Sequence, residues 1–175
     1  MATDRNVPRG SSVESTFLLV RDTATDQCRP AQADEVLLAA ERLLRLAIHD
    51  RSVMDAPRTV RDFLRVRLGT LEHEVFSVML LDAQNRLIEY VELFRGTVTQ
   101  TSVYPREVVR EALVKNAAGV ILVHNHPSGL SQPSRADECL TQTLVKALML
   151  IDVRVLDHLV VTPGQVTSFA ESGLL

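Results

Sequence analysis

Short apolar runs that alternate with helical patterns constrain the fold of this chain more than any other feature of its sequence. Residues 75–81 and 118–123 are too short and too rich in β-branched and apolar side chains to form helices, so both are predicted to be buried strands. Residues 153–162 form a third run of this kind. In the segment after Pro105 and in residues 135–151, apolar residues recur every three or four positions, as on one helix face. This order predicts an α/β protein, a three-layer α/β/α sandwich with a mixed sheet.

The sequence is predicted to divide into a tail, a helical segment and a main domain. Residues 1–30 mix Ser, Thr, Pro and charged residues and are expected to form a flexible tail. Residues 31–70 form a helical segment, and residues 71–175 form the main domain. The remaining predicted elements are helices over 31–48 and 57–69 and a hairpin strand over 86–94 that follows a turn at 82–85.

Composition narrows the class of protein. With 175 residues of which 46% are hydrophobic, the chain can bury a core and is not a disordered protein. The net charge of −3 argues against a protein that coats nucleic acid. The sequence has neither an apolar run of about 20 residues nor a signal peptide, so we expect a soluble, cytoplasmic protein without a membrane partner. Cys28 and Cys139 favour neither a disulfide framework nor an all-cysteine zinc site.

One segment combines several groups that bind metals. His124 and His126 stand at positions i and i+2 at the end of a predicted strand, so their side chains point to the same side, with Cα atoms roughly 6.5 to 7 Å apart. The chain then turns at Pro127 and Gly129 and brings back Asp137 in the first turn of the next helix. Two imidazoles and one carboxylate match a catalytic zinc site, in which a fourth position is left for water.

Simpler interpretations exist for the same residues. Five histidines in a chain of this length produce a His-x-His pair by chance about one time in seven. Ser134 and Asp137 also have the spacing of a capping box at the start of a helix. The capping and ligand hypotheses are compatible, because a capped helix end is a rigid support for a metal ligand.

The complete pattern resembles a known family. His124-x-His126-Pro127, six residues, and then Ser134-x-x-Asp137 is similar to the signature of JAMM (MPN-plus) metalloprotease domains. The resemblance covers about residues 71–175 and is closest to the RadC-like branch of the family. The segments that carry this closer similarity are Leu81-Asp82, Gly96-Thr97, Tyr104-Pro105-Arg106-Glu107, His124-Asn125-His126-Pro127-Ser128-Gly129 and Asp157-His158.

The resemblance implies a cytidine-deaminase-like fold with one zinc ion (Zn2+) per chain. The ligands would be His124, His126 and Asp137. Ser134 would correspond to the hydroxyl that stabilises the developing oxyanion.

The resemblance also implies a general base and a reaction. A glutamate just before the first core strand acts on the zinc-bound water in the family. Glu74 matches this glutamate by position, and Glu72 is the alternative. The expected activity is that of a zinc metalloprotease that hydrolyses a peptide or isopeptide bond, so the expected partner is a peptide or protein substrate.

A second function, the binding of DNA or protein without catalysis, is also compatible with the sequence. Longer RadC-like proteins carry a helix-hairpin-helix DNA-binding region that this chain does not show, which leaves a short form. The alternative is a DNA-repair-associated or mobile-element module that binds DNA or protein without protease activity. Its contacts would use four arginines of a predicted helix, although the net charge does not support DNA binding. These are Arg58, Arg61, Arg65 and Arg67.

Two nuclease- or deaminase-like interpretations fail on motif grounds. A zinc deaminase needs His-x-Glu and Pro-Cys-x-x-Cys, which this sequence lacks, and the contiguous His-Asn-His is not an HNH nuclease motif. His158 fits two interpretations, a partner of a ligand histidine or, preferentially, a buried histidine with satisfied hydrogen bonds. The oligomeric state is not predicted by any feature of the sequence.

Overall fold

The computed structural model describes residues 18–24, 26–49, 52–96 and 102–175. The chain divides into two compact units, Met1–Leu38 and Ala39–Leu175, which are described separately. In the first unit, strands β1 (Leu19–Arg21) and β2 (Cys28–Pro30) pair in antiparallel register. The backbone N–H of Ala31 donates to the carbonyl of Leu18 at 2.7 Å, which closes this hairpin. Residues 19–21 and 28–30 of the expected tail therefore form strands, whereas residues 1–17 and 25 lie outside the described residues.

The second unit is built on a five-stranded mixed sheet in the order β4-β3-β5-β6-β7. β3 pairs with β4 and β5 in antiparallel register, β5 and β6 are parallel, and β7 is antiparallel to β6. Because β5 and β6 run in the same direction, a helical connection joins them. The strands are β3 (Val75–Leu81), β4 (Leu87–Arg95), β5 (Gly119–Asn125), β6 (Arg154–Val161) and β7 (Val166–Ser168).

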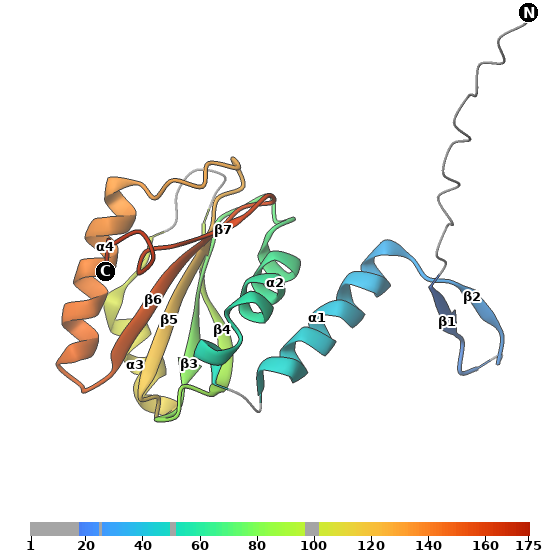
Figure 1. The fold of residues 1–175 in the computed structure, drawn as a ribbon, viewed down its shortest axis with the longest axis horizontal. Helices are drawn as coiled ribbons and strands as arrows, with labels where there is room; N and C mark the ends of the chain where they lie inside the picture. The colour runs from blue at the N-terminus through green and yellow to red at the C-terminus, as the bar shows by residue number, and fades with distance from the viewer. Residues whose placement is uncertain (1–17, 25, 50–51, 97–101) are drawn as a thin grey trace, which may run out of the picture. The chain divides into compact units, whose positions relative to one another are not determined.

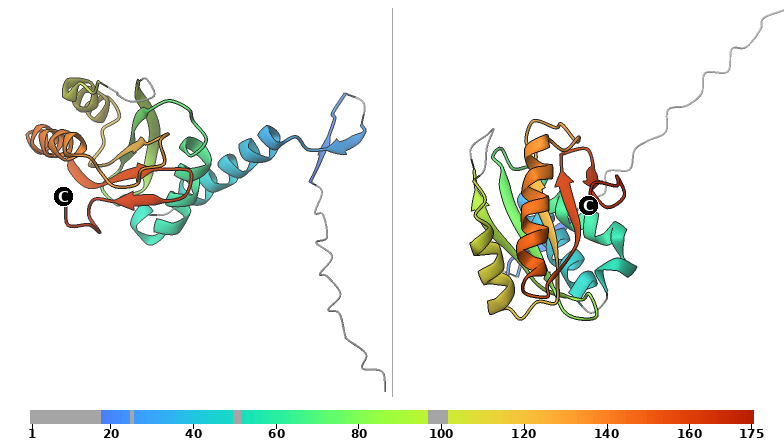
Figure 2. Two further views of the ribbon diagram at one scale, coloured as in Figure 1. Left: turned by 90° about the horizontal axis from the view of Figure 1, so that it is seen from above. Right: turned by 90° about the vertical axis from the view of Figure 1, so that its left-hand side faces the viewer.

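Helices cover both faces of this sheet. α2 (Pro57–Leu68) lies on one face, preceded by the short 3₁₀ helix η1 (Val53–Asp55), and α3 (Pro105–Val114) and α4 (Arg135–Met149) lie on the other (Figure 1). The right-hand view of Figure 2 looks onto α3 and α4 with the sheet behind them. The predicted three-layer α/β/α sandwich with a mixed sheet is confirmed.

The buried central strands explain why this arrangement is stable. Every residue of β3 and β5 is buried, as expected for strands covered on both faces. Alternate residues of β5 enter different cores: Ile121 packs with the α2 side, and Leu122 packs with the α3 and α4 side. The apolar runs found in the sequence are thus central strands of the sheet, which is the middle layer of the sandwich.

The domain boundaries differ from those predicted. The residue 70 boundary falls inside the second compact unit, because α2 buries Phe63 and Leu64 against the sheet. The boundary between the two compact units lies instead within α1 (Ala33–His49). Among the described residues, none of the helices has both the length and the apolar character needed to cross a membrane.

Candidate metal centre

β5 and the residue directly after it supply the two histidines of the centre. His124 lies in the strand, between Phe76 of β3 and Val160 of β6, and is only 7% exposed. The backbone N–H of His126 donates to the carbonyl of Val161 at 2.8 Å, so the chain stays in register with β6 just beyond the end of β5. The two imidazole centroids are 4.7 Å apart. The predicted placement of both side chains on the same side of the strand is therefore observed.

The carboxylate of the centre is held at the start of α4. Ser134 is the N-cap residue, and its hydroxyl oxygen accepts a hydrogen bond from the backbone N–H of Asp137. In return, Oδ2 of Asp137 accepts from the backbone N–H and the hydroxyl of Ser134 at 2.7 and 2.6 Å. The predicted capping box is present, and it fixes the rotamer of Asp137 toward the two histidines.

The separations of the three side chains fit one zinc ion. Nε2 of His124 lies 3.0 Å from Nε2 of His126 and 3.4 Å from Oδ1 of Asp137. Nε2 of His126 lies 3.6 Å from Oδ2 of Asp137. A tetrahedral zinc ion with ligands at about 2.0 to 2.2 Å requires separations of about 3.3 to 3.6 Å. The two separations that involve Asp137 fall in this range, and the two histidine nitrogens would move apart by about 0.3 Å to reach it. Among the described residues, these three form the group that could hold a metal ion, and the donor set is that of a catalytic site.

A backbone carbonyl fixes the proton of His126. Nδ1 of His126 lies 2.7 Å from the carbonyl oxygen of Leu130. A carbonyl can only accept a hydrogen bond, so Nδ1 carries the proton and Nε2 presents a lone pair when the imidazole is neutral. That lone pair faces His124 and the carboxylate of Asp137. Electron-rich atoms at such short separations repel each other unless a cation lies between them.

The charges of the cluster respond to this crowding. Burial raises the pKa of Asp137, but the neighbouring side chains of His124, His126 and Ser134 outweigh burial and hold this pKa well below its usual range. The nearby carboxylate of Asp137 raises the pKa of His126, against the effect of burial. In the metal-free protein this carboxylate therefore favours a proton on His126.

Glu74 and Glu72 occupy different surroundings. Glu74 directly precedes β3 and is partly buried, and its negative charge contributes to the raised pKa of His126 after the larger effect of Asp137. Glu72 is exposed. The structure thus places Glu74 within electrostatic reach of the histidine cluster.

Asn125 holds the segment that carries Glu74. Its Oδ1 accepts a hydrogen bond from the backbone N–H of Val75 at 2.7 Å, and its Nδ2 donates to the carbonyl of His73 at 3.0 Å. These bonds attach the backbone on both sides of Glu74 to β5. Sequence reasoning missed this role, although the position of Asn125 between the two histidines means that its side chain must point to the opposite face of the strand.

His158 packs directly against a ligand histidine. Its Nε2 lies 2.8 Å from Nδ1 of His124, and its Nδ1 lies 2.6 Å from the hydroxyl oxygen of Thr141. Burial holds the pKa of His158 well below its usual range, so this imidazole is neutral. His158 is therefore buried and hydrogen-bonded, and it also contacts His124, one of the two histidines that could hold a metal ion. The sequence contains no signal for Thr141, because its contact depends on the register of β5, β6 and α4.

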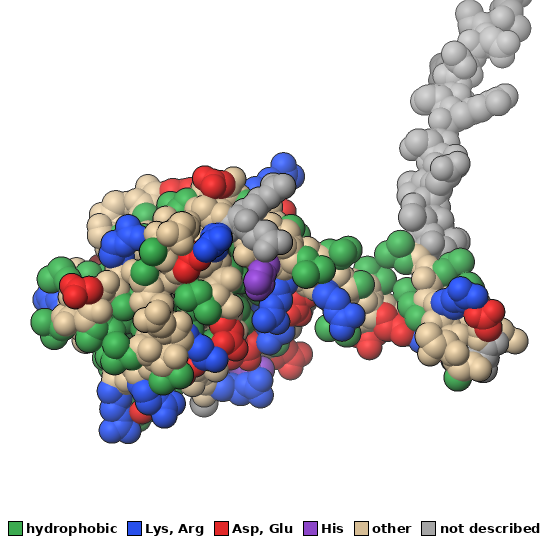
Figure 3. All heavy atoms as spheres, turned by 90° about the horizontal axis from the view of Figure 1, so that it is seen from below, with side chains coloured by type: hydrophobic (Ala, Val, Ile, Leu, Met, Phe, Trp, Pro, Cys, Tyr) green, Lys and Arg blue, Asp and Glu red, His purple; other side chains and the backbone are tan. Residues whose placement is uncertain are grey.

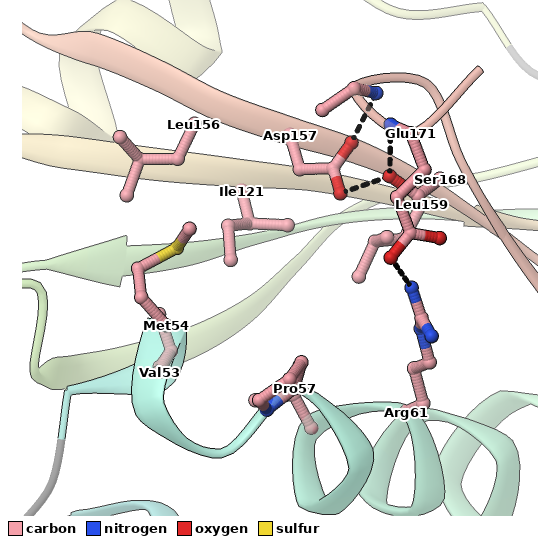
Figure 4. A pocket seen from close by; sticks show the side chains of 12 residues that line it. Val53, Met54, Pro57, Arg61, Ile121, Leu156, Asp157, Leu159, Ser168 and Glu171 are labelled. Atoms are coloured by element: carbon pink, nitrogen blue, oxygen red, sulfur yellow. Dashed lines mark hydrogen bonds and ion pairs between the residues drawn. The ribbon is translucent and has the colours of Figure 1, made fainter.

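A separate apolar pocket lies between α2 and the sheet (Figure 4). Ile121 of β5 and Leu159 of β6 line it, on the α2 side rather than the side of His124. At its rim, the carboxylate of Asp157 accepts hydrogen bonds from the Ser168 hydroxyl and the Ala170 N–H. The pocket therefore contributes no group to the histidine cluster.

The arginines of α2 are partly neutralised by nearby carboxylates. Arg61 forms an ion pair with Glu171, and Arg67 forms ion pairs with Glu41 and Glu92. Figure 3 shows that basic and acidic side chains are intermixed on the face it presents. These pairings reduce the positive field that a DNA contact through this helix would require.

Comparisons with known proteins agree with the geometry. The family model described as the RadC-like JAB domain matches residues 54–174. A UPF0758 protein of Leptothrix cholodnii is 61% identical over 149 residues, which cover 83% of this chain and 67% of that protein. A UPF0758 protein of Aromatoleum aromaticum is 61% identical over 146 residues, 83% of this chain and 65% of that protein.

A third relative extends the match, and all three are longer than the matched segment. A UPF0758 protein of Methylibium petroleiphilum is 53% identical over 165 residues, 90% of this chain and 74% of that protein. The chain thus spans about two thirds to three quarters of the length of these relatives. The matched family model covers the whole histidine and carboxylate cluster, and the chain therefore belongs to the RadC-like JAB domain family.

Proposed function

We propose that this protein is a zinc-dependent metallo-hydrolase that cleaves a peptide or isopeptide bond. The observation that carries the proposal is the convergence of His124, His126 and Asp137, whose ligand atoms all lie within 4.8 Å of one another. Membership of the JAB family supports a hydrolase, and two histidines with one carboxylate leave a fourth zinc position open for solvent.

Each residue of the centre has a distinct part in this reaction. When bound, zinc lowers the pKa of a coordinated water toward about 7 and polarises the scissile carbonyl. Glu74 accepts the proton of the attacking water and later delivers it to the leaving amine. Glu74 is suited to this because its charge already reaches His126.

Ser134 is proposed to donate a hydrogen bond to the developing oxyanion. In the structure its hydroxyl donates to Oδ2 of Asp137 at 2.6 Å. The backbone N–H of Ser134 donates to the same oxygen, so Asp137 keeps a hydrogen bond when the hydroxyl turns toward a substrate. The capping box thus leaves the hydroxyl available without releasing the carboxylate.

The test is metal content together with hydrolysis. His126→Ala and Asp137→Ala each remove one ligand, so elemental analysis should find zinc in the wild type and sharply less in both variants. Glu138→Ala is the matched control, because Glu138 also lies in the first turn of α4 and should leave zinc unchanged. Wild-type protein should cleave a pool of peptide and isopeptide substrates, and the two ligand variants should not.

Two outcomes would contradict the proposal. Stoichiometric zinc in both ligand variants would refute the assignment of the metal ligands. A wild-type protein that takes up no zinc would instead favour a module that binds other macromolecules without catalysis.

A further inference from the structure

Two buried side chains, those of His158 and Thr141, connect the proposed ligand His124 to the backbone of the proposed ligand Asp137. Nδ1 of His124 faces Nε2 of His158 at 2.8 Å, and Nδ1 of His158 faces the hydroxyl of Thr141 at 2.6 Å. The Thr141 hydroxyl in turn donates to the backbone carbonyl of Asp137 at 2.6 Å. The three linked residues come from β5, β6 and α4, and each is at most 7% exposed.

The direction of the hydrogen bonds in this chain follows from the hydroxyl. Thr141 has one hydroxyl proton, and the Asp137 carbonyl accepts it. The hydroxyl oxygen therefore accepts from Nδ1–H of His158. A neutral imidazole with its proton on Nδ1 has a lone pair on Nε2, so His158 accepts from Nδ1–H of His124.

This order leaves Nε2 of His124 without a proton. Nε2 is the atom that faces His126 and Asp137, at 3.0 and 3.4 Å. If the chain ran in the opposite direction, Nε2 of His124 would carry a proton and could not bind a metal. The protonation pattern of the chain therefore decides whether His124 is able to act as a ligand.

We propose that Thr141 and His158 are positioning residues that hold His124 as its Nδ1–H tautomer and so prepare Nε2 for zinc. This inference rests on the proposed metal centre. Metal-ligating histidines commonly donate their second N–H to a carboxylate or carbonyl. Here a neutral histidine is the acceptor, and the same threonine hydroxyl also contacts the backbone of the third ligand.

Aromatic rings exclude water from the hydrogen bonds that link His124, His158 and Thr141. The ring of Phe169 stacks on His158 with centroids 4.6 Å apart, and the ring of Phe76 stacks on His124 at 6.5 Å. His158 is fully buried and Thr141 is 1% exposed. Because solvent has no access, water cannot replace a hydroxyl that is removed by mutation.

The experiment compares variants at one position. Thr141→Val keeps the shape of the side chain but removes the hydroxyl, so His158 loses its acceptor and the tautomers of both histidines change. We expect zinc affinity, measured by competition with a chromophoric chelator, to fall about 10- to 100-fold. Long-range 1H–15N NMR of the metal-free protein should show His124 moving from the Nδ1–H to the Nε2–H form.

Two controls separate this effect from a general effect on α4. Thr141→Ser keeps the hydroxyl and should retain the zinc affinity and the His124 tautomer of the wild type. Thr143→Val removes a comparable hydroxyl, which donates to the Cys139 carbonyl at 2.8 Å but is exposed. This variant should also behave as the wild type. If Thr141→Val does not fold, Thr141→Ala removes the same hydroxyl without adding a methyl group.

The outcomes distinguish this inference from the proposed function. Unchanged zinc affinity and an unchanged His124 tautomer in folded Thr141→Val would overturn the inference and leave the metal centre intact. Absence of zinc binding by the wild type would refute the proposed function. The NMR comparison of metal-free wild type and Thr141→Val would still decide whether the hydroxyl sets the tautomer.

Discussion

Glu74 and Glu72 are two positions apart, and they differ in burial and in their effect on His126. Its charge acts on His126, whereas Glu72 is exposed. We therefore expect Glu74→Gln to retain zinc but to lose hydrolysis by about 100-fold or more, because the general base is removed. Glu72→Gln is the matched control and should keep both properties. Elemental analysis measures the zinc content, and turnover of a cleaved peptide measures the hydrolysis. An inactive Glu72→Gln would instead identify Glu72 as the general base.

His126 is the proposed ligand at which protons and zinc would compete. The nearby carboxylate of Asp137 raises the pKa of His126 from its usual value of 6.5 in the metal-free protein. A protonated imidazole cannot bind zinc, so affinity should fall as the pH decreases, and the fall should begin above pH 6.5. Zinc titrations by calorimetry at stepped pH check this prediction. Affinity that is constant through this range would contradict it.

The raised pKa of His126 also affects the stability of the metal-free protein, but in the opposite direction: zinc affinity falls at low pH, whereas this contribution to stability falls at high pH. A folded-state pKa above the unfolded value contributes stability that is fully present below the unfolded pKa, and that stability is lost as the pH rises through the folded pKa. Urea denaturation of the metal-free protein should therefore show this contribution of His126 disappearing at higher pH. His126→Gln should remove that part of the pH dependence.

At the scale of elements, Asn125 joins β5 to the segment before β3. Asn125→Ala would leave the buried N–H of Val75 without its partner and release the carbonyl of His73. We expect a loss of about 1 to 3 kcal/mol in the free energy of unfolding, measured in urea. Hydrolysis should fall more than zinc content does, because Glu74 lies in the released segment while the ligands do not. Equal losses of both would indicate general unfolding of the centre.

The main strands and helices could be predicted from the sequence because their hydrophobic periods are local. β7 and η1 have only three residues each and carry no period that a pattern could reveal. The helix over 31–48 is predicted from apolar residues at helical spacing, but in α1 Leu43 is 67% exposed and Ile48 is the buried residue. A period therefore identifies a helix without showing what covers its apolar side.

Some residues of the candidate centre could be predicted from the sequence and others could not, because only some of their contacts are between residues close in the chain. The spacing of His124, His126 and Asp137 could be read from the sequence because one strand, one turn and one helix start determine it. The contacts of His158 and Asn125 could not, because they depend on the register of neighbouring strands. Residues that are close in the sequence therefore identify the proposed ligands, whereas the residues that support them come together only when the strands pair.

At the scale of the whole molecule, the candidate centre belongs to a single unit. Every residue proposed for it lies within Ala39–Leu175, and the first unit contributes none of them. We expect a protein that begins at Ala39 to bind zinc with an affinity close to that of the full chain. Elemental analysis and thermal unfolding of both forms, with and without zinc, measure this. A shortened protein that folds but has lost zinc would assign the first unit a part in the centre.

The carbonyl of Leu130 that orients His126 belongs to the connection between β5 and α4, and the side chain of this leucine is 70% exposed. The hydrogen bond to the His126 imidazole depends on the position of the Leu130 peptide group and not on the Leu130 side chain. The side chain at position 130 can therefore vary in chemical character and present different surfaces to an approaching molecule, whereas Gly129, with a φ of 80°, cannot be exchanged freely. Adding or removing one residue between His126 and Leu130 would displace the carbonyl and rotate the ring, so the length of this turn is constrained more strictly than the side chain of residue 130.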